Sequence, residues 1–132
     1  MSVTLTDQDK LTLRTAAYGA VSLLAAAGSS PHKAATDGTI ALSSATGLVG
    51  HVLAEKSKGV NLTGKSVAGL ADQVLPALTA AVSLLEKQAP AEADNFRSTV
   101  LVAIEAAKTH QGASSPTMAE MARKITAALD AA

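Results

Sequence analysis

Apolar residues recur every three or four positions along most of the chain, which is the period of a helix with one buried face. The first such stretch follows Thr6, Asp7 and Asp9, a combination typical of helix N-termini, and it ends at Gly28. Its apolar positions are Leu13, Ala17, Ala20, Leu24 and Ala27. The pattern predicts a helix over residues 7–27.

Proline, glycine and lysine divide the rest of the chain into four further segments. Pro31 predicts the start of a second helix, which a lysine-rich stretch before Gly59 would close. We expect Thr63 to be the N-cap of the third helix, and Pro90 and Pro116 to begin the fourth and fifth. The expected buried positions are Leu42, Val49 and Val52, then Val67, Leu70, Val74, Leu78 and Leu85, then Phe96, Val100 and Ile104, and finally Met118, Met121, Ile125 and Leu129.

Pro76 lies inside the third predicted helix. A proline there removes a backbone hydrogen bond and clashes with the preceding turn, so we expect it to kink the helix or to divide it near residues 73–75. We also expect Gly38 to break the front end of the second helix, because glycine loses more backbone entropy in a helix than other residues do. The sequence therefore predicts an all-α fold: a compact bundle of five helices, or six if Pro76 divides the third, in a single domain over residues 1–132.

Small residues dominate the apolar content. The 132 residues include 29 alanines and 16 leucines, whereas Tyr18 and Phe96 are the only aromatic residues. Alanine and leucine are among the best helix formers. Residues 16–27 are nearly apolar on every side, so this helix is either central in the bundle or part of a subunit interface. Because large apolar side chains are few, burial against a second copy would add stability, and we expect a homo-oligomer.

Charge and cysteine content exclude several classes of function. The chain has 11 basic and 11 acidic residues and no cysteine. We therefore expect neither nucleic acid nor a membrane as a partner, and no disulfide, thiolate chemistry or cysteine-bound metal. We expect no cofactor. The acidic residues near the N-terminus do not suit a secretory leader, so we expect a cytoplasmic protein.

Residues 59–66, with the sequence GVNLTGKS, match the phosphate-binding pattern G-x-x-x-x-G-K-[ST]. A nucleotide site of this type needs a preceding β-strand and a parallel sheet, and the helical pattern offers neither. A helix end, a short loop and a helix start explain the same letters. What remains is a helix N-terminus that offers backbone amides and Lys65 to an anion such as phosphate, around Thr63, Gly64, Lys65 and Ser66.

His51 and Glu55 lie four residues apart in the second predicted helix, on one face. This spacing suits a pair of metal ligands or an imidazole oriented by a carboxylate. Further ligands would have to come from facing helices, where the candidates are Asp72, Glu86, Asp94 and Glu105. The alternative is a surface contact between the two side chains.

No catalytic constellation is evident in the sequence. We expect a non-enzymatic, self-associating interaction or structural domain. The alternative is a helical bundle that binds a metal ion or small ligand around His51 and Glu55, and a nucleotide-phosphate binder through residues 59–66 is a third possibility.

Overall fold

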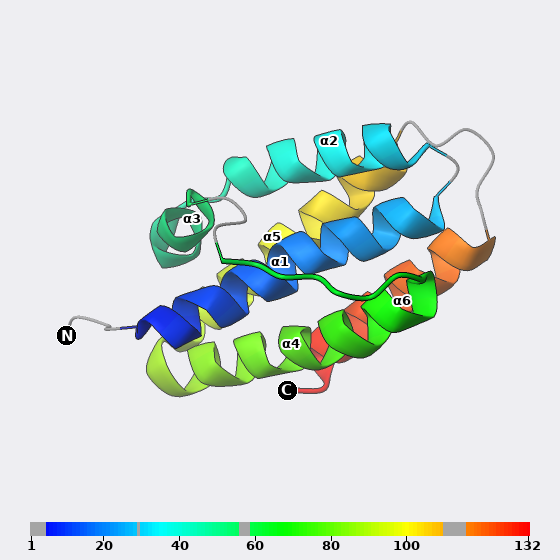
Figure 1. The fold of residues 1–132 in the computed structure, drawn as a ribbon. Coiled ribbons are helices and arrows are strands. Elements are labelled where there is room, and N and C mark those ends of the chain that lie inside the picture. Colours follow the sequence, from blue (N-terminus) through cyan, green and yellow to red (C-terminus); the bar gives the residue numbers. More distant parts are fainter. Residues whose placement is uncertain (1–4, 29, 56–58, 110–115) are drawn as a thin grey trace.

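The computed structural model describes residues 5–28, 30–55, 59–109 and 116–132, and within these residues it contains six α-helices and no strand (Figure 1). The helices are α1 (Asp7–Ala27), α2 (Pro31–Ser43), α3 (Gly47–Leu53), α4 (Val67–Gln88), α5 (Pro90–Lys108) and α6 (Pro116–Asp130). They pack together as a compact bundle, so the predicted all-α fold is confirmed.

Helix α1 begins where the sequence predicts. The Thr6 hydroxyl accepts a hydrogen bond from the Asp9 amide at 3.0 Å, and the Asp9 carboxylate accepts one from the Thr6 amide at 3.2 Å. This reciprocal pair satisfies two amides that would otherwise have no partner at the helix N-terminus. The chain leaves the helix at Gly28, as expected.

The second predicted helix is two helices. It stops at Ser43 and resumes at Gly47 as the short α3. The Ser43 and Ser44 hydroxyls donate to the carbonyls of Thr39 and Ala41, which competes with continued helical pairing. Gly47 then adopts a φ of 70°, a conformation that glycine reaches without the steric cost that other residues meet.

The extra helix therefore does not come from Pro76. Helix α4 continues through Pro76 as one helix of 22 residues. Gly38 does not interrupt α2 either, because it lies buried in the middle of that helix.

The start of α4 differs from the predicted one. Ser66, not Thr63, is the N-cap residue, and its hydroxyl accepts a hydrogen bond from the Gly69 amide at 3.0 Å. The sequence contains several residues suited to capping in this stretch, and their hydrogen bonds decide among them. Helices α5 and α6 begin at Pro90 and Pro116, as predicted. The expected lysine-rich end of the second helix, at Lys56 and Lys58, lies outside the described residues.

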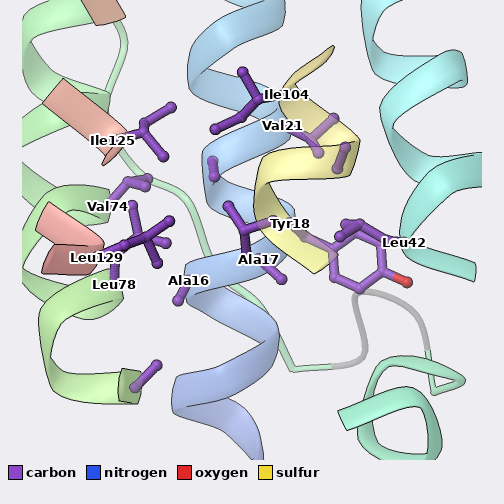
Figure 2. Packing of buried hydrophobic residues seen from close by; sticks show 14 of the residues in the cluster. Ala16, Ala17, Tyr18, Val21, Leu42, Val74, Leu78, Ile104, Ile125 and Leu129 are labelled. Atoms are coloured by element: carbon purple, nitrogen blue, oxygen red, sulfur yellow. The ribbon is translucent and has the colours of Figure 1, made fainter. Parts of the chain in front are cut away.

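Helix α1 is the centre of the bundle and packs against all five other helices (Figure 1). Ala16, Ala17, Ala20, Leu23 and Leu24 are fully buried within the single chain. Of the two interpretations of residues 16–27, the structure thus shows the central helix. Figure 2 shows the side chains around α1: Val74 and Leu78 of α4 with Ile125 and Leu129 of α6 on one side, and Leu42 of α2 on the other.

Two glycines set how closely the helices approach α1. A Cβ atom on Gly19 of α1 would lie 2.7 Å from Val74 Cγ2 of α4. A Cβ atom on Gly38 of α2 would lie 2.7 Å from Val21 Cγ1 of α1. Neither distance leaves room for a methyl group, so both helix pairs rely on the missing side chain for their spacing.

Helix α4 combines length with an apolar composition. Its most apolar window of 18 residues has a mean hydropathy of 1.5, with 28% of the window buried, which makes it long and apolar enough to cross a membrane on length and composition alone. No other described helix meets this measure. Core helices of soluble bundles pass the same test, so this measure alone is weak evidence for a membrane span.

Candidate functional site

In the described residues, His51 and Glu55 make no hydrogen bond or ion pair with each other. His51 lies on the exposed side of α3, whereas Glu55 follows the end of that helix. The Glu55 carboxylate receives a hydrogen bond from the Arg14 guanidinium of α1, with 2.9 Å between Nη1 and Oε2. Glu55 thus joins the end of α3 to the central helix.

The acidic residues proposed as further ligands lie elsewhere. Glu86 and Asp94 both pair with Arg97, at 2.8 Å and 3.1 Å. Glu105 pairs with Lys108 one turn along α5. Across the described residues, no group of three or more histidine, aspartate or glutamate side chains is placed to hold a metal ion. Of the acidic residues considered as metal ligands, only Glu55 is close to His51 in sequence, and its carboxylate is already paired with Arg14.

The segment from Thr63 to Ser66 is extended and folds against the start of α4. Gln73 of α4 holds this segment: its side chain accepts a hydrogen bond from the Thr63 amide at 3.0 Å and donates one to the Asn61 carbonyl at 2.6 Å. A Cβ atom on Gly64 would lie 2.5 Å from the Leu70 nitrogen, so backbone packs directly on backbone here.

This geometry gives a structural role to the two glycines and the serine of the phosphate-binding pattern. Gly59 adopts a φ of 78°, Gly64 permits the close approach, and Ser66 caps α4. Lys65 is exposed. The strand that a nucleotide-binding loop requires in front of it does not occur in the described residues. Only the weaker prediction remains here, which is that an anion binds at the helix start around Thr63, Gly64, Lys65 and Ser66.

The structure contains a shallow groove between α2 and α5, which the sequence did not predict. It consists of two neighbouring hollows of about 270 Å³ and 210 Å³ that share Ala41. We call this surface the α2–α5 groove. Its lining is Asp37, Ile40, Ala41, Ser44, Ala45, Thr46, Asn95, Ser98, Thr99, Val102, Ala106 and Thr109.

Two large apolar side chains project beside these hollows. Ile40 of α2 is 63% exposed and Val102 of α5 is 57% exposed, the two highest values for large apolar residues in the described parts of the chain. Leu101, the residue before Val102 in α5, is also exposed but does not line the groove. The sequence contains one indication of this surface: Ile40 and Val102 are large apolar residues that fall outside the helical periodicity of the core positions.

A third hollow, of about 340 Å³, lies beside the N-terminal half of α1. Its lining is Asp7, Lys10, Leu11, Arg14, Glu55 and Gly59. Four of these residues share one face of α1, and Glu55 and Gly59 complete the described lining. Only Glu55 among these residues belongs to a site proposed from the sequence.

Tyr18 lies one helical turn beyond Arg14 and belongs to the same junction of α1 with α3. Its hydroxyl donates a hydrogen bond to the Leu53 carbonyl at 2.9 Å, within the protein interior. Burial raises the pKa of the Tyr18 hydroxyl above its ordinary value of 10.0. Arg14 and Tyr18 therefore both attach the C-terminal end of α3 to α1.

Comparison of the chain with protein-family models, with curated proteins and with solved structures finds no match.

Proposed function

We propose that this protein is a non-enzymatic interaction domain that associates with a second copy of itself through the α2–α5 groove. The observation that carries the proposal is the exposure of Ile40 and Val102 next to hollows lined by alanine. Large apolar side chains beside a groove are typical of surfaces that bind another protein.

The charge of the groove supports a close protein contact. Among the described residues of its lining, Asp37 is the one ionisable residue, and the others are apolar or neutral polar. Removing charged groups from water is costly unless they find partners, so an interface core avoids them. Covering the α2–α5 groove would bury few charges.

The shape of the groove supports a second copy as the partner. A dimer with two-fold symmetry uses the same surface on both subunits, so projections and hollows must occur together on one face. Here Ile40 and Val102 project beside hollows bounded by the small side chains of Ala41, Ala45 and Ala106. The apolar side chains of one copy would occupy the hollows of the other. The net charge of zero also means that two copies do not repel each other.

Sedimentation velocity across a dilution series tests the proposal, with the monomer mass of 13.2 kDa as the reference. We expect a species of twice that mass at high concentration, and we expect Val102→Asp to leave only the monomer. Leu101→Asp is the matched control, because it places the same charge at the neighbouring position of α5 outside the groove. This control should still dimerise.

Two results would contradict self-association through this surface. One is a wild-type protein that sediments as a monomer at every concentration. The other is equal loss of the dimer in the Leu101→Asp and Val102→Asp proteins, which would place the interface elsewhere or indicate general damage to α5. Circular dichroism of each variant distinguishes these cases.

A further inference from the structure

Asn95 of α5 lies where the α2–α5 groove meets the start of α3. It lines the smaller hollow of the groove together with Thr46 and Ser98. Its side-chain nitrogen donates one hydrogen bond to the Thr46 carbonyl at 2.8 Å and another to Glu92 Oε1 at 3.2 Å. These two acceptors use both hydrogens of the Asn95 amide group. The same side chain therefore belongs to the proposed interface and to the support of α3.

The oxygen of the Asn95 side chain is in contact with water in the single subunit. It accepts no hydrogen bond from the described residues, and among these residues no buried side-chain nitrogen or oxygen lacks a partner. The Thr46 side chain makes no capping bond, and Ser98 is exposed in the same hollow. A second copy that covers this hollow would remove water from all three side chains.

The start of α3 is held by α5 and not by a cap of its own. Glu92 Oε1 accepts a hydrogen bond from the Val49 amide at 3.0 Å. A Cβ atom on Gly47 would lie 3.1 Å and 3.2 Å from the two carboxylate oxygens of Glu92 and 3.4 Å from Asn95 Nδ2, so both side chains pack directly on the first residue of α3. A helix of seven residues has little stability by itself, so its first turn depends on this contact.

We propose that Asn95 couples dimerisation through the α2–α5 groove to the order of the first turn of α3. This inference rests on the proposed function. When a second copy covers the smaller hollow, Asn95 loses the water that competes for its hydrogen bonds. The bonds from Asn95 to Thr46 and Glu92 become stronger in these drier surroundings. The Glu92 carboxylate is then held more firmly against the Val49 amide.

The coupling acts in both directions. If dimerisation orders the first turn of α3, an ordered first turn favours dimerisation by the same factor. Glu92 and the residues of α3 are not in the described lining of the groove, so they act on the interface through Asn95 and Thr46. Displacement of the start of α3 should therefore weaken the dimer without any change in the groove residues. The start of α3 is thus a place where the assembly can be regulated.

Amide hydrogen exchange of the wild-type protein, measured across the concentration range in which it dimerises, tests the coupling. We expect the Val49 amide to exchange about fivefold more slowly in the dimer than in the monomer. Gly69 is the matched control, because its amide donates to the Ser66 hydroxyl at the start of α4 over the same distance of 3.0 Å, and neither residue is in the described lining of the groove. Exchange of the Gly69 amide should not change.

Glu92→Ala tests the reverse direction. Sedimentation velocity should give a dissociation constant of the dimer about fivefold higher than that of the wild type. Glu105→Ala changes a residue of the same helix that is also outside the described lining, and it should leave the constant unchanged. Glu92→Gln keeps an acceptor oxygen for the Val49 amide and should restore most of the affinity. Circular dichroism verifies that each variant remains helical.

Two results would overturn the coupling while the dimer itself remains. One is a dimer in which the Val49 amide exchanges as fast as in the monomer, or in which Val49 and Gly69 are slowed equally, since equal slowing reflects general stabilisation. The other is equal dimerisation of the Glu92→Ala and wild-type proteins. A wild-type protein that stays monomeric contradicts the proposed function, and the coupling with it, so the two failures are distinguishable.

Discussion

Glu92 of α5 caps the N-terminus of α3: its carboxylate Oε1 accepts a hydrogen bond from the Val49 amide at 3.0 Å. Thr46, which stands at the N-cap position of α3, makes no capping hydrogen bond with its own side chain. Asn95 assists by donating to both the Thr46 carbonyl and Glu92 Oε1. Glu92, 43 positions away in the chain, therefore accepts the hydrogen bond that the side chain of a neighbouring N-cap residue usually accepts.

Glu92→Ala should lower the free energy of unfolding by about 1 kcal/mol, because the Val49 amide loses its acceptor and the helix start loses a nearby negative charge. Chemical denaturation measures this change, and amide hydrogen exchange at Val49 should become faster. Glu105→Ala is the control on the same helix. Its carboxylate makes only an exposed ion pair with Lys108, so the expected change is below about 0.5 kcal/mol. An equal loss in both variants would argue against the cap.

Tyr18→Phe should cost about 1–2 kcal/mol of stability, because the Leu53 carbonyl would lose its buried hydrogen-bond donor. The variant removes a single oxygen atom and keeps the ring, so packing changes little. Denaturation at neutral pH measures the loss. No measurable loss would mean that water or another group replaces the hydroxyl at this carbonyl.

The pH dependence of Tyr18 provides a separate test. Burial raises its pKa in the folded protein above 10.0, so the folded state holds the proton more tightly than the unfolded state does. This contribution to stability is complete below the unfolded pKa and is lost as the pH rises through the folded pKa. Because Tyr18 is the one tyrosine of the chain, ultraviolet absorbance of the tyrosinate reports its titration directly. The midpoint should lie above 10.0 in the folded protein and return to that value in denaturant.

Gly38→Ala should destabilise the protein despite the higher helix propensity of alanine. The new methyl group would lie 2.7 Å from Val21 Cγ1 and 2.9 Å from Val21 Cγ2. Overpacking of this kind costs about 1–3 kcal/mol, which exceeds the gain of up to about 1 kcal/mol in helix propensity. Thermal unfolding measures the net loss.

A double-mutant cycle checks the cause. In a Val21→Ala background the space beside residue 38 is open, so Gly38→Ala should be neutral or stabilising there. The same cost of Gly38→Ala in both backgrounds would show that contact with Val21 is not responsible.

The sequence by itself determined the helical class, the start of α1 and the buried stripes of the long helices. Thr6 with Asp9, Pro90, and the stripe from Met118 to Leu129 all act through residues within a few positions of one another. Local interactions of this kind leave a pattern in the chain, and the pattern was sufficient to predict them.

Only the tertiary structure decided the break between α2 and α3, the cap from Glu92 and the pairing of Arg14 with Glu55. The cap and the ion pair depend on groups that are far apart in sequence, with separations of 43 positions for Val49 and Glu92 and 41 positions for Arg14 and Glu55, and the cap from Glu92 holds the start of α3 after the break. The spacing of His51 and Glu55 suggested one partner for Glu55, and helix packing supplied another. The α2–α5 groove is likewise set by how two helices lie together, since exposure is a property of the packed chain and not of Ile40 or Val102 alone.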